Sequence, residues 1–294
     1  MRTTARSREK TGVPRAIIHD HGSELKVGVT QFQTQHHNTS SIYDIKHKIA
    51  LEIKHRMEPD RQWKAFNQTA STIDKRLRQT AYAHLTPPKL RNKSRYMNLD
   101  TRVGWAKRML KLMDETNEEE SKALESRIGE LKAYHNDIQR WSEMLTITGQ
   151  VENFSRQQWL SKGCETKLSS DLTARLSVQA PDNQALAQSL VDFIQRQSDD
   201  CRQGEYLPNS SEVLESLFGR QKYMEGEQAN RGFSGLLLSM GAMVSDLSTS
   251  VIKKAMETTP VKKVIAWQKD FMNGSLQARR VATNLATKTE QKAT

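Results

Sequence analysis

The chain has 294 residues, of which 36% are hydrophobic, and carries 45 Lys and Arg against 34 Asp and Glu, for a formal net charge of +11. Its most apolar stretch, residues 232–252, is interrupted by several polar residues including Asp246, which excludes a membrane-spanning helix of about 20 apolar residues there. The two cysteines, Cys164 and Cys201, lack the spacing of a disulfide scaffold or a zinc module. No apolar run follows the basic N-terminus, so we expect no secretory signal, no membrane partner and a cytoplasmic protein.

The beginning of the chain predicts a strand, a helix and a second strand. Residues 16–19 form a short apolar run after a Gly-Val-Pro turn, and residues 41–45 form a second one. Between them, Leu25, Val29 and Phe32 recur at helical spacing. A strand–helix–strand unit of about 30 residues is typical of an α/β sheet.

From residue 46 to about residue 203 the pattern predicts helices with few glycines. The predicted breaks between them lie at residues 58–60, 86–88, 148–149 and 180–182, where Pro or Gly occurs. The expected fold class is therefore α/β plus a large all-helical part, mostly α overall.

The net charge is concentrated in a basic block, residues 61–112. It contains thirteen Lys or Arg and only two acids, Asp74 and Asp100, and Trp63, Tyr82, Tyr96 and Trp105 are interleaved with them. Such a block suits the phosphate backbone of DNA, and we expect Arg91, Lys93 and Arg95 to contact it. The alternative is a solvated surface paired with the acidic residues 113–130.

Two further positions carry candidate chemistry. Asp20 follows the first predicted strand and precedes a glycine turn, a place where α/β folds put reactive side chains. A helix is predicted to start near Asn209, with Val213, Leu214, Leu217 and Phe218 on its core face. Glu215 and Lys222 share another face of that helix. Taken singly, Asp20 could equally be a turn residue, and Glu215 and Lys222 could equally belong to an exposed helix face.

Four segments resemble the later part of bacterial insertion-sequence transposases of the DDE class, and the resemblance covers nearly the whole chain. They are residues 14–23 (PRAIIHDHGS), 42–48 (IYDIKHK), 95–100 (RYMNLD) and 211–222 (SEVLESLFGRQK). The resemblance implies an RNase H-like core interrupted by a helical insertion domain. It divides the chain into residues 1–60 as partial core, 61–205 as insertion domain, and 206–294 as core-completing helices with a basic tail.

The same resemblance implies the roles of individual residues. Asp20 matches the second catalytic Asp, Glu215 the catalytic Glu, and Lys222 a DNA-contacting Lys after that Glu. Asp20 and Glu215 would be metal ligands for Mg²⁺ or Mn²⁺ in cleavage and strand transfer of DNA. The family's first Asp is unmatched, because residues 1–19 contain Glu9 as their one acid. We therefore expect an N-terminally truncated transposase that is inactive alone. Asp44 is the candidate substitute for the missing Asp, but we expect it to have a structural role.

The family pattern also departs from the sequence just before the catalytic Glu. Pro208 and Ser211 stand where a Tyr and an Arg often occur. A homo-oligomer or an upstream-encoded segment is an expected partner besides DNA. Two alternatives remain open: a non-catalytic helical DNA-binding or interaction protein, and a metal site from the eight histidines, of which His19, His21, His36 and His37 are near one another in sequence.

Overall fold

The computed structural model describes residues 12–90, 96, 98–175, 180–227, 241, 243, 245 and 248–272. The chain divides into two compact units, Met1–Ser210 and Ser211–Thr294. Helices dominate the described residues, and the strands among them form one two-stranded sheet. The expectation of a mostly helical chain is confirmed, whereas the RNase H-like core and the three-part domain division remain predictions.

The predicted strand–helix–strand unit is present. It consists of β1 (Ala16–His19), α2 (Ser23–Gln35) and β2 (Ser40–Tyr43), and the strands are parallel, with Ala16 paired to Ser40 and His19 to Tyr43. The second strand ends two residues earlier than predicted. It ends there because Asp44 starts a helix, its side chain accepting hydrogen bonds from the backbone N–H groups of Lys46 and His47.

The helical part of the first unit follows directly. Its elements are α3 (Ile45–Met57), α4 (Arg61–Leu77), η1 (Ala83–Leu85), α5 (Leu99–Glu115), α6 (Glu118–Ile128), η2 (Gly129–Tyr134), α7 (His135–Gln157), α8 (Cys164–Arg175) and α9 (Pro181–Ser198). The predicted breaks at 58–60, 86–88 and 180–182 are confirmed, with Pro181 in the first turn of α9, where its missing N–H costs nothing.

The predicted break at residues 148–149 is wrong, because α7 runs through it without interruption. Thr148 is buried and its hydroxyl donates to the carbonyl of Leu145 at 3.0 Å, which satisfies the side chain inside the helix. Gly149 costs a helix about 1 kcal/mol relative to Ala. Burial of Ile147 and Val151 on either side offsets that cost.

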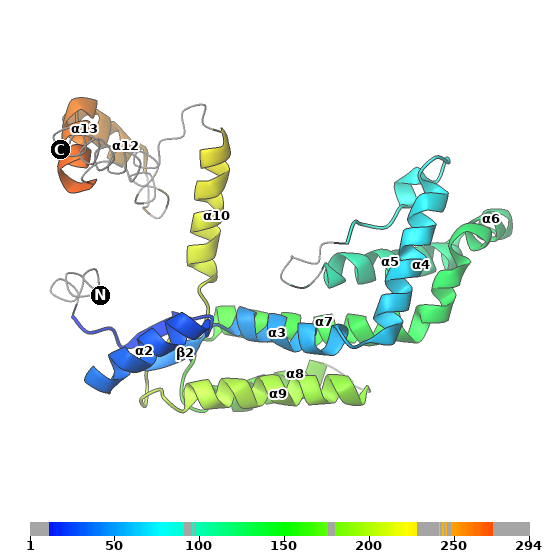
Figure 1. The fold of residues 1–294 in the computed structure, drawn as a ribbon, viewed down its shortest axis with the longest axis horizontal. Coiled ribbons are helices and arrows are strands. Elements are labelled where there is room, and N and C mark those ends of the chain that lie inside the picture. The colour runs from blue at the N-terminus through cyan, green and yellow to red at the C-terminus, as the bar shows by residue number, and fades with distance from the viewer. Residues whose placement is uncertain are drawn as a thin grey trace, which may run out of the picture. The chain divides into compact units, whose positions relative to one another are not determined.

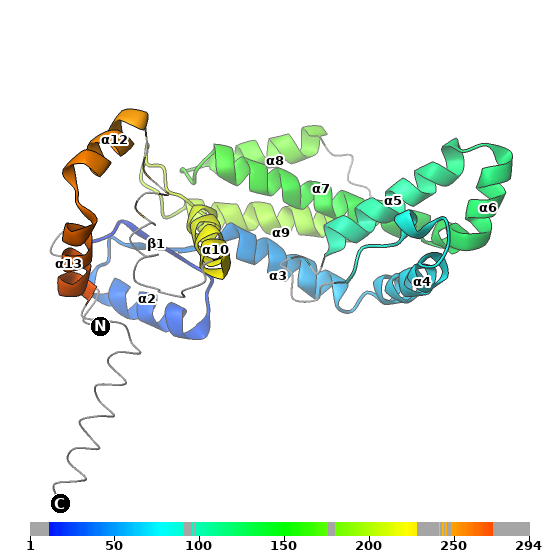
Figure 2. The same ribbon diagram turned by 90° about the horizontal axis from the view of Figure 1, so that it is seen from above.

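The core of the first unit is organised around α7 (Figures 1 and 2). Along its length this helix packs against α3, α8 and α9 and against α5 and η2. An aromatic cluster links α4, α5 and α7: the ring of Phe66 lies 5.5 Å from Trp63, 5.3 Å from Trp141 and 6.5 Å from Trp105. All four side chains are buried, so this cluster fixes α4 against its neighbours.

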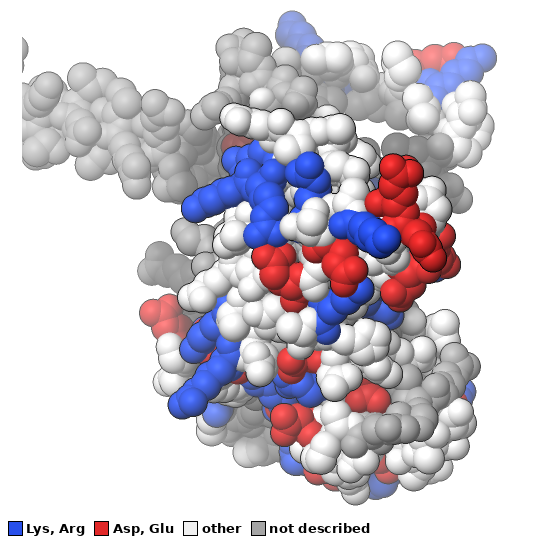
Figure 3. Space-filling view, turned by 90° about the vertical axis from the view of Figure 1, so that its right-hand side faces the viewer, with Lys and Arg blue, Asp and Glu red and all other residues white. Residues whose placement is uncertain are grey.

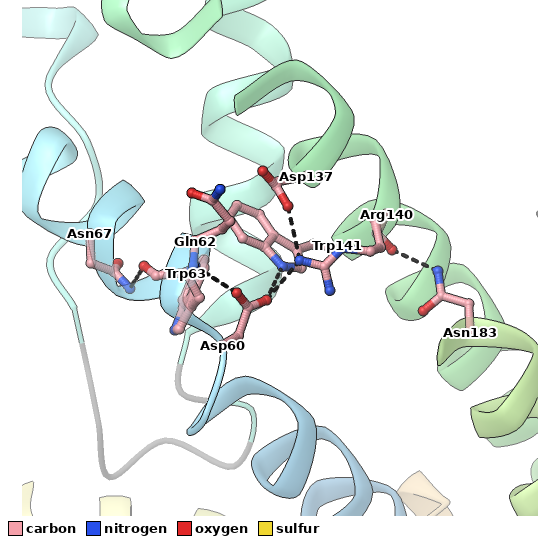
Figure 4. Close-up of polar contacts among 8 residues, drawn as sticks. All are labelled: Asp60, Gln62, Trp63, Asn67, Asp137, Arg140, Trp141 and Asn183. Atoms are coloured by element: carbon pink, nitrogen blue, oxygen red, sulfur yellow. Dashed lines mark hydrogen bonds and ion pairs between the residues drawn. The ribbon is translucent and has the colours of Figure 1, made fainter. Parts of the chain in front are cut away.

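A polar hub joins the start of α4 to α7 beside that cluster (Figure 4). One oxygen of Asp60 accepts the backbone N–H groups of Gln62, at 2.8 Å, and Trp63, at 3.1 Å, and thereby caps α4. The other oxygen accepts hydrogen bonds from Arg140, at 2.8 Å, and from the indole of Trp141, at 3.1 Å. One carboxylate therefore both starts a helix and ties it to a helix about 80 residues later in the chain.

The second unit contains α10 (Glu212–Glu227), α12 (Thr249–Thr258) and α13 (Val261–Met272). The predicted core face of α10 is wrong for three of its four residues, since Val213, Leu214 and Phe218 are 76%, 56% and 51% exposed. Most of the apolar stretch at residues 232–252 lies outside the described residues. Among the described helices none combines the length and apolar character needed to cross a membrane.

Candidate active site

Asp20 lies where the sequence predicts it, immediately after β1 at the carboxyl end of the parallel strands. Its side chain is exposed, and Oδ1 accepts the backbone N–H of Gly22 at 3.0 Å. A Cβ on residue 22 would stand 3.2 Å from that oxygen, which is why a glycine suits this turn. Within the described residues Oδ2 accepts no hydrogen bond, so one oxygen of Asp20 is available to a ligand.

Three aromatic side chains surround Asp20. His21 has a left-handed backbone with φ of 58°, and its ring lies 4.2 Å from Tyr43 and 4.4 Å from His19. The backbone N–H of His21 donates to Nδ1 of His19 at 3.3 Å, so the ring proton of neutral His19 must be on Nε2. That Nε2 then donates to the hydroxyl of Ser41 at 2.8 Å, which fixes the ring.

The surroundings of these rings keep them neutral. Burial lowers the pKa of both His19 and His21, and the negative charge of Asp20 opposes that shift only in part. The pKa of Tyr43 is raised by burial first and then by Asp20. The positive charge of Lys26 lowers the pKa of both rings further, so the charges beside them are those of Asp20 and Lys26.

We expect the two histidines to make folding stability depend on pH. Because their pKa is lowered in the folded state, the unfolded chain binds more protons, and stability present above about pH 6.5 is lost as pH falls below it. Urea unfolding between about pH 7 and pH 5 measures this slope. His21→Gln should flatten it, whereas exposed His135→Gln should not, and equal slopes in all three proteins would contradict the expectation.

Asp44 is not a second free carboxylate at this edge. The residue is 1% exposed, and its Oδ1 accepts the backbone N–H of Lys46 at 2.8 Å and of His47 at 3.3 Å. Asp44 caps α3, which agrees with the structural role expected for it from the sequence.

Glu215 and Lys222 both lie on α10, in the second unit. Glu215 is half-buried near the start of the helix, and its backbone N–H donates to the carbonyl of Ser211 at 3.0 Å. Lys222 is exposed two turns further on, and a seven-residue spacing keeps both on one face. Asn209, the predicted cap, instead donates to the hydroxyl of Ser155 at 3.1 Å. The approach of Asp20 to Glu215 stays a prediction.

The four-histidine metal site is wrong. His19 and His21 lie at the carboxyl end of β1, while His36 and His37 follow the far end of α2, a helix about 20 Å long. Both ring nitrogens of His19 already have partners. In the described ranges no three His, Cys, Asp or Glu side chains gather closely enough to hold a metal ion.

The basic block is partly neutralised by acidic neighbours. Arg76 pairs with Glu130 at 2.7 Å and Lys111 with Glu115 at 3.5 Å, as the alternative reading expected, and Arg102 is buried. The three residues predicted to contact DNA, Arg91, Lys93 and Arg95, lie outside the described residues. The remaining Lys and Arg of the block are exposed.

The sequence missed the stacking of His21 on Tyr43. The register of the parallel strands places Tyr43 opposite His19, so the ends of the two predicted strands could have indicated this contact.

In comparisons with known proteins, no family model, curated protein or solved structure matches the chain. Function must therefore be argued from the residues themselves.

Proposed function

We propose that this chain is part of a DDE-type transposase, which cuts DNA and joins it to a new site. The observation that carries the proposal is Asp20: an exposed carboxylate directly after a strand of a parallel strand–helix–strand unit, with one oxygen held by Gly22. The helices from α4 to α9 would correspond to the insertion domain, and α10 would supply Glu215.

Asp20 fits a Mg²⁺ or Mn²⁺ ligand because a carboxylate is the donor that these ions prefer. The neighbouring groups do not compete for that role, since His19 uses both ring nitrogens and Asp44 caps a helix. When bound, a pair of divalent cations activates the attacking oxygen and stabilises the leaving oxygen in phosphoryl transfer. Asp20 and Glu215 would hold the cations, and Lys222 would contact a phosphate of the DNA.

We predict that the carboxylates of Asp20 and Glu215 come within about 10 Å, close enough to share one metal site. The test is a pair of cysteines, Asp20→Cys with Glu215→Cys, treated with a short bifunctional maleimide and mapped by mass spectrometry of the linked peptides. Because the link is identified by its peptides, Cys164 and Cys201 can remain in place.

The control pair is Asp20→Cys with Arg220→Cys. Residue 220 is exposed on the same helix but about 140° round from residue 215. We expect the 20–215 link to form several times more readily than the 20–220 link. Equal yields, or no 20–215 link in the folded protein, would contradict the shared metal site and favour the alternative, a non-catalytic helical DNA-binding protein.

A further inference from the structure

The outer face of α4 is a stripe of exposed polar and basic residues without an acid. It consists of Arg61, Lys64, Gln68, Ser71, Thr72 and Lys75. At 100° per residue these six fall within an arc of about 100°, opposite the buried face that contains Trp63, Phe66 and Ile73. The stripe runs for about 21 Å along the helix, from residue 61 to residue 75.

The energetics of the helix explain only part of this stripe. Lys75 lies in the last turn of α4, where a positive charge suits the helix dipole, but Arg61 and Lys64 lie within four residues of its start, where a positive charge opposes the dipole. The N-cap Asp60 is the acid at that start, and the first turn of α4 itself contains none, whereas that of α6 contains Glu118, Glu119 and Glu120. The helix alone therefore gives no reason for Arg61 and Lys64, and a binding partner would account for them.

Pairing within the protein does not explain the stripe either. Arg76 and Arg78, on the same helix but outside the stripe, pair with Glu130 and Asp74. In contrast, Arg61, Lys64 and Lys75 form no ion pair with any part of the chain that the structure describes. Figure 3 views this end of the helical region, where Lys and Arg are interspersed with Asp and Glu and a dense group of acidic residues lies at the upper right.

We propose that the outer face of α4 binds the phosphate backbone of duplex DNA; the choice of DNA among polyanions rests on the proposed function. Lys, Arg, Gln, Ser and Thr are the side chains that make such sequence-independent contacts. A length of about 21 Å along the duplex axis corresponds to about six base-pair steps, enough for the three cations to reach separate phosphates. The hydroxyls of Ser71 and Thr72 donate to carbonyls of their own helix, so the three cations carry most of the binding.

The test is a triple variant, Arg61→Gln, Lys64→Gln and Lys75→Gln, in the full chain. Its binding to a fluorescent DNA duplex is measured by anisotropy over a series of NaCl concentrations. Each phosphate contact contributes about −0.9 to the slope of log K against log salt, so the slope should become shallower by up to about 2.7. Far-UV circular dichroism and a thermal melt verify that the variant is folded.

A matched control removes the same charge elsewhere: Lys162→Gln, Lys167→Gln and Arg196→Gln, all exposed and without an ion pair among the described residues. It should keep the wild-type slope. Equal losses in both variants, an unchanged slope in the α4 variant, or tighter wild-type binding to single-stranded DNA or RNA of the same length would overturn the proposal. The link between residues 20 and 215 is measured without DNA, so a failure of the catalytic assignment and a failure of this proposal are distinguishable.

Discussion

Replacing Asp60 by Ala is expected to lower the free energy of unfolding by about 3 kcal/mol. The loss has two sources: the cap of α4 contributes about 1 kcal/mol, and the charged hydrogen bond to Arg140 about 2 kcal/mol. Side-chain exposure is 9% for Asp60 and 25% for Arg140, so removal of the carboxylate leaves a largely buried guanidinium with Asp137, at 2.9 Å, as its remaining acidic partner. The indole N–H of Trp141 loses its acceptor as well.

Urea denaturation of the full chain measures this effect, and Asp60→Asn is the matched control. The amide oxygen can still cap the helix, so its loss should be about 2 kcal/mol, or two-thirds of that of Asp60→Ala. Burial works against ionisation of Asp60, but hydrogen bonds from Arg140 and Trp141 outweigh it and lower the pKa. This contribution is therefore present above about pH 4 and disappears as pH falls below it. A loss under about 1 kcal/mol in Asp60→Ala would contradict the role of the hub.

Local signals in the sequence were sufficient for the elements whose causes are local. The apolar run at residues 16–19, the spacing of Val29 and Phe32, and the proline at residue 181 each act within a few residues. For the same reason Asp20 could be placed at the end of its strand: a strand followed by a glycine turn needs no distant partner.

Contacts between residues far apart in the sequence, and the features that depend on them, could not be predicted from local signals. Asp60 contacts Arg140 across 80 positions, and nothing near either residue indicates the other. The break expected at Thr148 and Gly149 fails because packing of α7 on both sides outweighs the low helix propensity of a single glycine. The apolar pattern of α10 predicts a face but does not say whether anything covers it, and Val213 is mostly exposed.

Strand cleavage is expected to depend on a carboxylate from outside this sequence. A two-metal site of this class needs three carboxylates, and here Asp20 and Glu215 are the candidates, because Asp44 already caps α3. We therefore expect the purified 294-residue chain not to cut DNA with Mg²⁺ or Mn²⁺. Cleavage should appear when a segment bearing the family's first Asp is fused to the chain or supplied in trans.

In that reconstituted protein, Asp20→Ala and Glu215→Ala should each lower the cleavage rate by about a thousandfold or more, since either change removes a metal ligand. The measurement is nicking of a labelled duplex under single-turnover conditions. Asp44→Asn is the control, because an amide oxygen can keep the cap of α3, and cleavage should persist. Robust metal-dependent cleavage by the 294-residue chain alone, lost in Asp20→Ala, would contradict this account. The site would then be complete within the chain, and Asp44 would be the first acid to test as its third ligand.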